Sequence, residues 1–160
     1  MDDILNILRN NAAMPVDKIA RLVNQTADEV AAKIKDWESD GTILGYTTVI
    51  NTDKLQDESQ VMAMIEVKIT PEREGGFDKI ARKIARYPEV KSCYLMSGGF
   101  DLLVMVEGDN LRQVAGFVSE RLATIQGVIS TGTHFILKPY KQQGVTFLEE
   151  ERHERLNVTP

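Results

Sequence analysis

A strict alternation of side chains over residues 61–69 constrains the fold more than any other stretch of the chain. Every odd position is apolar, whereas the even positions hold Met62, Met64, Glu66 and Lys68. Successive side chains of a β-strand point to opposite faces of a sheet, so this period of two predicts a strand with one buried face. That face needs a covering layer of other elements.

Two segments of helical period can supply the cover. Apolar residues recur at helical spacing within residues 77–87, where Pro88 disfavours continuation of the helix, and within residues 111–122. The element order over residues 61–138 is therefore expected to be βαββαβ. The three further strands are expected at about residues 89–97, 101–107 and 128–137.

An internal repeat supports this order. Tyr-Pro-Glu-Val at 87–90 and Ile-Gln-Gly-Val at 125–128 follow the two helices at matching places, which indicates a doubled βαβ unit. Such a unit gives an α+β, ferredoxin-like (ACT-like) domain, with a four-stranded antiparallel sheet and both helices on one face. The other face, with Met and Val on it, is uncovered, so we expect a homodimer through this domain.

Residues 1–50 show helical periodicity first and β-rich sequence last. Apolar spacing predicts helices over about residues 2–12 and 15–23 and a third between Thr26 and Gly41. Asn24 tolerates the left-handed conformation of a tight turn, and Thr26 with Glu29 forms a capping box. With a β wing over residues 43–50, this order predicts a winged helix-turn-helix domain.

The polar, acidic segment 51–60 is expected to be a linker, and residues 139–160 are expected to form a C-terminal tail. Residues 1–59 hold 6 Lys and Arg against 11 Asp and Glu, so they carry the whole net charge of −5. A nucleic-acid surface should be basic. The count therefore argues against such a surface there, unless the few cations gather on one face.

Other protein classes are excluded by what the sequence lacks. No apolar run approaches the roughly 20 residues of a membrane helix, and the N-terminus is acidic, so we expect a cytoplasmic protein that does not bind membranes. A single cysteine, Cys93, and two histidines, His134 and His153, offer no ligand set, so we expect neither a metal nor a cofactor. Cys93 and His134 are interpreted as core or interface side chains.

A set of motifs in a fixed order and spacing extends over both expected domains. These motifs are Ile19-Ala20, Val23-Asn24-Gln25-Thr26, Val30, Ile34, Trp37-Glu38, Gly41, Ile43, Gly45-Tyr46 and Ser97-Gly98-Gly99-Phe100-Asp101-Leu102. Through them the chain resembles the Lrp/AsnC (feast/famine) family of prokaryotic transcription regulators over about residues 2–140. The resemblance implies an N-terminal DNA-binding domain and a C-terminal ligand-sensing and assembly domain, with dimers that commonly assemble into octamers. It therefore implies double-stranded DNA, further copies of the chain and a small effector such as an amino acid as partners.

Three positions depart from the family pattern. Asn24 stands where members usually have Gly, and Asn is the best substitute in a left-handed turn. The third helix holds Lys33, Lys35 and Asp36 where members are often rich in Arg. Gly99 replaces the first acid of the usual Gly-Asp-Phe/Tyr-Asp pattern, which leaves Asp101 as the acid of the sensing loop.

A DNA-binding face is expected on the third helix. If Val30, Ile34 and Trp37 point inward, the opposite face points outward. Lys35 could then reach phosphate or guanine, and Asp28 could accept from cytosine N4. Alternatively, the first-turn acids complement the helix dipole and the lysines form a solvated face. The expected DNA-binding residues are Thr26, Asp28, Ala32, Lys33, Lys35 and Ser39.

An effector site is expected at the loop of residues 98–101. The two glycines leave backbone N–H groups open to a carboxylate, and Asp101 offers an oxygen to an ammonium, which matches the two ends of an amino acid. Alternatively, the glycines form a plain hairpin turn, and the threonines below are ordinary strand residues. The expected effector-binding residues are Gly98, Gly99, Phe100, Asp101, Thr131 and Thr133.

The function expected from these features is a DNA-binding transcription regulator that responds to an amino acid or related effector, not an enzyme. One alternative is a non-regulatory amino-acid-binding or architectural DNA protein. Another is an enzyme like the haem-biosynthesis decarboxylases that resemble this family. That alternative needs basic and imidazole groups converging in a pocket, and His134 is the only histidine within the expected domains.

Overall fold

The structure is a computed structural model, and it describes residues 1–55, 60–71 and 76–147. Two compact units make up the described chain. One consists of Met1–Ile50 with the described part of Lys141–Pro160, and the other is Asn51–Tyr140.

The first unit contains α1 (Asp3–Asn10), α2 (Val16–Val23) and α3 (Ala27–Ser39). Side chains cap two of these helices: Asp2 accepts from the N–H of Ile4 at 2.8 Å, and the expected capping box is present at the start of α3. Pro15 lies at the N-cap position, just before the first residue of α2. The core of this unit consists of Ile4, Leu8, Ile19, Ala20 and Val30.

The turn between α2 and α3 has the predicted geometry. Asn24 adopts φ 53° and ψ 47°, the left-handed conformation, and its N–H donates to the carbonyl of Ala20. Gln25 donates to the same carbonyl at 3.0 Å. Asn24 and Gln25 are therefore the only residues between the end of α2 and Thr26, the N-cap of α3.

The prediction of a β wing is wrong, because the structure shows no strand over residues 43–50. Ile43 donates its N–H to the carbonyl of Trp37 at 2.8 Å, and the Tyr46 hydroxyl donates to Glu38 Oε1 at 2.8 Å. The run has β-forming residues, but a strand exists only where another strand pairs with it. A short hairpin, β5 (Lys141–Gln142) with β6 (Val145–Thr146), lies instead within the expected tail.

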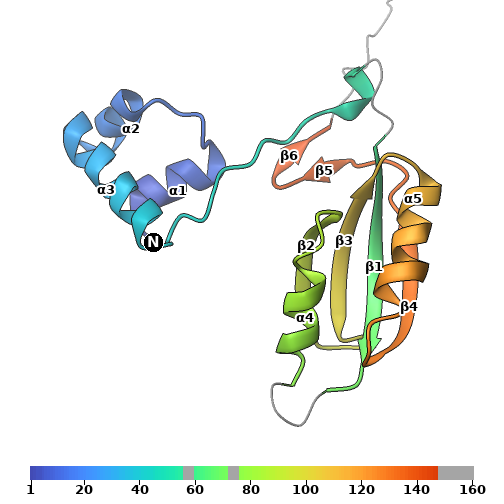
Figure 1. The fold of residues 1–160 in the computed structure, drawn as a ribbon. Coiled ribbons are helices and arrows are strands. Elements are labelled where there is room, and N and C mark those ends of the chain that lie inside the picture. The colour runs from blue at the N-terminus through green and yellow to red at the C-terminus, as the bar shows by residue number, and fades with distance from the viewer. Residues whose placement is uncertain (56–59, 72–75, 148–160) are drawn as a thin grey trace, which may run out of the picture. The chain divides into compact units, whose positions relative to one another are not determined.

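The second unit begins with a short helical turn, η1 (Thr52–Lys54), in the expected linker, and then has the predicted βαββαβ order. Its four strands form an antiparallel sheet in the order β2-β3-β1-β4, a ferredoxin-like α+β arrangement (Figure 1). The elements are β1 (Val61–Ile69), α4 (Asp78–Ile84), β2 (Val90–Leu95), β3 (Leu102–Gly108), α5 (Leu111–Gly116), η2 (Phe117–Leu122) and β4 (Val128–Phe135).

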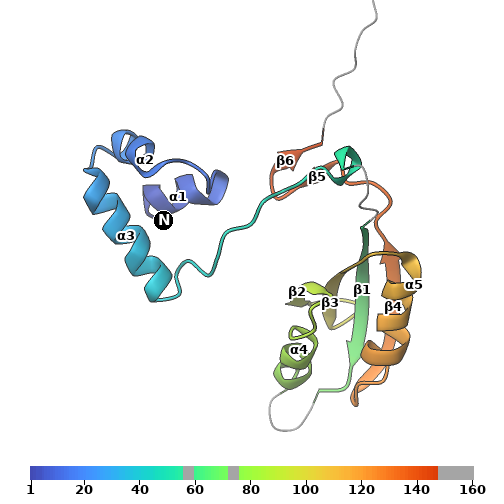
Figure 2. The same cartoon turned by 45° about the horizontal axis from the view of Figure 1, so that its top comes forward.

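Both helical segments cover the same face of the sheet, as Figure 2 shows. The odd residues of β1 from Ala63 to Ile69 are buried against them. The η2 segment is a π-helical turn that continues α5, with the N–H of Ala123 donating to the carbonyl of Val118 at 2.8 Å. The residues that the helical segments and the following turn bury against the sheet are Ile80, Ile84, Val114, Phe117, Leu122 and Ile125.

The opposite face of the sheet is covered by no element of this unit. Met64 and Met105 lie directly across from each other on it, and both are half-buried. His134 lies on the same face, with Nε2 3.5 Å from Glu66 Oε1. The valines expected here lie instead on the helix-covered side, so methionine supplies much of the apolar surface of the open face. The open face comprises Met62, Met64, Glu66, Lys68, Ser92, Tyr94, Leu103, Met105, Glu107, Ser130, Gly132 and His134.

The two repeated turns each contact the other half of the domain, by different means. Glu89, in the first turn, accepts a 2.7 Å hydrogen bond from Arg121 of η2. Gly127, in the second, has φ +95°, and its carbonyl accepts from the N–H of Thr70 at 2.8 Å. The positive φ favours glycine at position 127, and a Cβ there would lie 2.6 Å from Cδ1 of Ile80 in α4, so a side chain would displace the end of Ile80.

Candidate functional site

The outer face of α3 carries four of the expected DNA-binding residues together. Asp28, Ala32, Lys35 and Ser39 recur at helical spacing and are all exposed, while Val30 is buried on the opposite side. Ser39 Oγ donates back to the carbonyl of Lys35 at 2.8 Å. Among these four residues, Lys35 is the only cation. The face could lie against a base-pair edge or a phosphate through the Lys35 ammonium.

Thr26 acts in this structure as a helix cap. Its N–H and hydroxyl donate to Glu29 Oε2 at 2.8 and 2.9 Å, and its hydroxyl oxygen accepts from the Glu29 N–H at 3.3 Å. The hydrogen bonds that the Glu29 carboxylate accepts from Thr26 lower its pKa, and the bond from the Thr26 N–H has the larger effect. The arrangement keeps a negative charge at the N-terminus of α3, where the helix dipole stabilises it.

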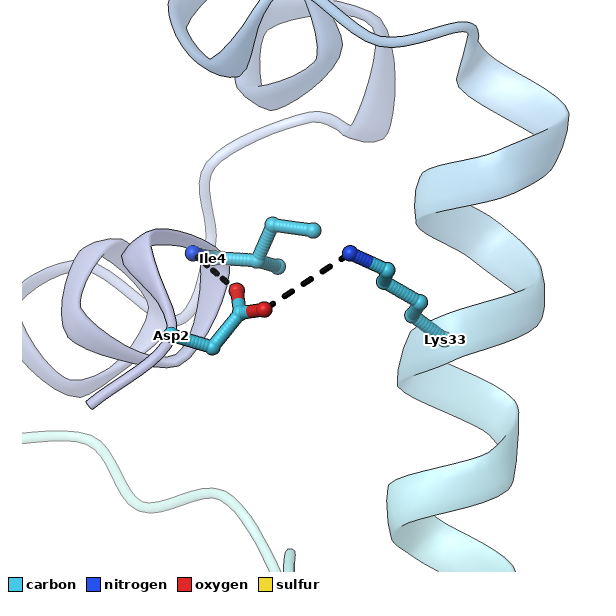
Figure 3. A network of polar contacts seen from close by, with 3 residues as sticks. All are labelled: Asp2, Ile4 and Lys33. Atoms are coloured by element: carbon cyan, nitrogen blue, oxygen red, sulfur yellow. Dashed lines mark hydrogen bonds and ion pairs between the residues drawn. The ribbon is translucent and has the colours of Figure 1, made fainter.

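Lys33 does not belong to the outer face of α3. Its ammonium lies 3.6 Å from Asp2 Oδ2, so the side chain reaches from α3 toward the start of α1 (Figure 3). The other oxygen of the same carboxylate caps Ile4. Lys33 therefore links two helices in this structure, and its expected contact with DNA stays a prediction.

The sequence reasoning missed a contact at the other end of α3. Tyr46 is exposed, yet its hydroxyl donates to Glu38, and this hydrogen bond is the main reason why the pKa of the phenol is raised. The bond attaches the segment that leaves the domain to the last turn of α3. The only sequence signal for this hydrogen bond is an acid eight residues before a tyrosine, and most residue pairs at that spacing make no contact.

The charge of this unit is unfavourable for DNA as a whole. Residues 1–50 contain five Lys and Arg against eight Asp and Glu, a net of −3. Besides Lys35, the exposed cations of the three helices are Arg9, Lys18 and Arg21. Attraction to phosphate must therefore come from a few local cations or from another part of the chain.

The loop that follows β2 is fixed to β1 by Asp101. The Asp101 N–H donates to the carbonyl of Val67 at 3.0 Å, and Asp101 Oδ2 accepts from the N–H of Ile69 at 2.8 Å. The Met96 N–H closes the loop by donating to the Asp101 carbonyl at 2.8 Å. One carboxylate oxygen of Asp101 thus has a structural role, as the acceptor for Ile69.

The glycines of the loop are open to solvent. Gly98 and Gly99 are exposed, nothing lies within 4 Å of a Cβ built on either, and no described residue accepts a hydrogen bond from their N–H groups. Gly98 has φ 155°, and Gly99 has no positive φ. Phe100 is half-buried beside them. The loop can therefore present two backbone donors to an anion.

Thr131 and Thr133 reach the same end of the sheet less directly. Val67 of β1 pairs with Thr131 of β4 on one side and with Leu102 of β3 on the other. The two threonines and the loop before Leu102 therefore lie on opposite sides of β1. Adjacent strands are about 4.8 Å apart, so about 10 Å separates Thr131 from Leu102. Both threonines are half-buried on the helix-covered side. The structure thus brings them near the loop but not into it.

No described part of the chain offers a metal centre or a membrane helix. Among residues 1–55, 60–71 and 76–147, no three His, Cys, Asp or Glu side chains come together as metal ligands. None of the helices within these ranges is both long and apolar enough to cross a bilayer. Burial raises the pKa of the Cys93 thiol, so the thiol stays protonated, as in a packing residue.

Comparison with known sequences places these features in one family. The family model for the Lrp/AsnC ligand binding domain matches residues 62–146, more than half of the chain. The chain belongs to the Lrp/AsnC family. It is 41% identical to the HTH-type transcriptional regulator YugG of Bacillus subtilis over 158 residues, which is 99% of this chain and 95% of that protein. It is 28% identical to the proline dehydrogenase transcriptional activator of Rhodobacter capsulatus over 140 residues, or 88% and 90% of the two chains.

Solved structures share the fold of this Lrp/AsnC chain. A transcriptional regulator of Neisseria meningitidis in complex with L-methionine superposes with a TM-score of 0.69 at 22% identity, over 89% of this chain and 93% of that one. The AsnC protein of E. coli superposes with a TM-score of 0.65 at 17% identity, over 89% and 95%. At such identities, the likeness concerns the fold.

Proposed function

We propose that this Lrp/AsnC protein is a cytoplasmic, non-enzymatic transcription regulator that binds double-stranded DNA through the helix-turn-helix α2–α3. The observation that carries the proposal is the left-handed turn at Asn24, directly followed by a capped α3 with an exposed outer face. This is the geometry that lets one helix enter a major groove while the preceding helix supports it. The names of YugG and of the Rhodobacter activator support the same function.

Within this function, the outer face of α3 is proposed to contact DNA through Asp28, Ala32, Lys35 and Ser39. Lys35 supplies the attraction, because its ammonium is exposed and centred on the face. Asp28 can accept from cytosine N4, so it selects among bases without adding attraction to the backbone. Thr26 contributes by fixing the start of the helix.

An amino acid is proposed to bind at the loop of residues 97–101. The N–H groups of Gly98 and Gly99 would donate to its carboxylate, and the oxygen of Asp101 that does not hold Ile69 would accept from its ammonium. The L-methionine complex of the Neisseria regulator supports an amino acid as the ligand class. Phe100, Thr131 and Thr133 would flank the ligand.

Assembly is proposed to occur through the open face of the sheet. Half-buried methionines on a face without cover are costly in a monomer, and a second copy would remove them from water. A ligand can alter DNA binding only if it binds two states of the assembly with different affinity, so the sensing loop should lie near a contact between copies.

Selection of bound duplexes from a random-sequence library, with the purified full-length protein, tests the proposal. We expect a sequence motif to be enriched, and its binding in gel shifts to change when a mixture of amino acids is added. Enrichment without any motif would indicate an architectural DNA protein. An absence of binding at low salt would refute the proposed function.

A further inference from the structure

A stripe of positive charge runs along α4, outside the proposed helix-turn-helix. It consists of Lys79, Arg82, Lys83 and Arg86, which follow the spacing i, i+3, i+4 and i+7 of one helix face. All four side chains are exposed. Arg86 lies just beyond the helix, in a turn held by its N–H bond to the carbonyl of Lys83.

The stripe lies opposite the buried side of α4. At about 100° per residue, the cations centre about 130° away from Ile80 and Ile84, which are buried against the sheet. Packing therefore does not account for the cations, because alanine or glutamine would serve a solvated helix equally well. Residues 78–86 hold four Lys and Arg and a single acid, Asp78, for a net of +3.

This charge is only partly neutralised within the chain. Asp78 lies 3.6 Å from Arg82, an exposed pair that contributes little stability. Lys83 and Arg86 form no ion pair with any described residue. The two cations at the end of the stripe are therefore available to an anionic partner.

We propose that the stripe on α4 binds the phosphate backbone of DNA that extends beyond the segment contacted by α3. The inference rests on the proposed function, and it accounts for the charge deficit of residues 1–50, whose net of −3 opposes DNA binding. The stripe spans about 10 Å along the helix, and the phosphates of one DNA strand advance about 3.4 Å per nucleotide along the duplex axis, so about three phosphates fall within that axial length. Its density of charge matches a nucleic-acid backbone.

The double variant Lys83→Glu/Arg86→Glu of the full-length protein tests this contact. A matched control, Lys54→Glu/Arg112→Glu, makes the same charge change on exposed residues of the same unit that lie off the stripe. Binding is measured to two random-sequence duplexes. One has about 20 base pairs, enough for two half-sites one turn apart, and the other has about 80.

We expect the double variant to bind the long duplex at least about tenfold more weakly than wild type at about 50 mM salt. The slope of log K against log salt should become shallower by about 2 for each stripe engaged, since each phosphate contact contributes about 0.9. The affinity of the double variant for the short duplex should equal that of wild type. The control variant should bind both duplexes with wild-type affinity. The conservative variant Lys83→Arg/Arg86→Lys should restore wild-type binding.

Three results would overturn the inference. An equal loss in the control would mean that net charge alone matters, and an equal loss on short and long duplexes would mean that the stripe does not contact extended DNA. Unchanged binding of the double variant would point to an acidic protein surface as the partner instead. If the wild-type protein binds neither duplex, the proposed function itself fails. A cooperative thermal unfolding transition, measured for each variant, shows that the variant is folded.

Discussion

Replacement of Asp101 separates its structural role from its proposed ligand role. In Asp101→Ala, the N–H of Ile69 loses its acceptor, and Ile69 is only 3% exposed, so water cannot easily take the acceptor's place. A hydrogen bond to a charged acceptor contributes about 1.5–3 kcal/mol, and an unpaired buried donor costs about as much. We therefore expect the free energy of unfolding of Asp101→Ala to be about 2 kcal/mol lower than that of wild type. For a domain of this size, the melting temperature should fall by about 10 °C.

The matched variant is Asp101→Asn, which keeps a carbonyl oxygen for Ile69 and removes only the charge. We expect its free energy of unfolding to lie within about 1 kcal/mol of the wild-type value, because the hydrogen bond survives with a neutral acceptor. Titration calorimetry of both variants against the twenty amino acids then measures the ligand role. Asp101→Asn should lose the effector, since a neutral amide attracts an ammonium far less than a carboxylate does.

Each half of this reasoning has its own refutation. If Asp101→Ala melts within about 2 °C of wild type, the bond to Ile69 does not stabilise the domain. If Asp101→Asn is as unstable as Asp101→Ala, the charge and not the acceptor matters for folding. If wild type binds an amino acid and Asp101→Asn binds it equally well, the proposed ammonium contact is wrong.

Three further predictions concern other parts of the chain. Lys35→Glu should abolish gel-shift binding to a selected duplex while light scattering shows intact assembly, and unchanged binding would remove the outer face of α3 as the DNA surface. Met105→Asp should convert a dimer into a monomer in light scattering at micromolar protein, and a persistent dimer would place the interface elsewhere. The pKa of Tyr46 is raised by its bond to Glu38, so the bond's contribution to stability is complete below about pH 10 and is lost as the pH rises through the raised pKa. An ultraviolet titration should show one late-ionising tyrosine, and Glu38→Ala should abolish the delay.

Local signals in the sequence predicted most of the fold. The left-handed turn at Asn24 and the capping box of Thr26 and Glu29 depend on residues no more than three apart, and both are present. The alternation over residues 61–69 correctly assigned the buried face of β1, because period alone decides which side chains share a face. The helix-covered sheet then followed from the order of elements.

Contacts between distant residues were beyond the same reasoning. Asp101 holds Ile69 across 32 positions, and Lys33 reaches back to Asp2, yet neither pair has a pattern that marks it in the sequence. The wing failed for the opposite reason. Residues 43–50 have the composition of a strand, but no partner strand pairs with them in the described chain, and composition does not reveal whether a partner exists.

The two repeated turns make the halves of the sensing domain unequal. Glu89 and Gly127 occupy the same place in the doubled unit, but Glu89 binds Arg121, whereas Gly127 needs a left-handed backbone against Ile80. A domain assembled from two copies of the first half would place a glutamate in a strained left-handed backbone, with its Cβ against Ile80. One assembled from two copies of the second half would lose the carboxylate that Arg121 binds. The internal symmetry is therefore one of backbone shape, and the side-chain contacts at the two turns are not interchangeable.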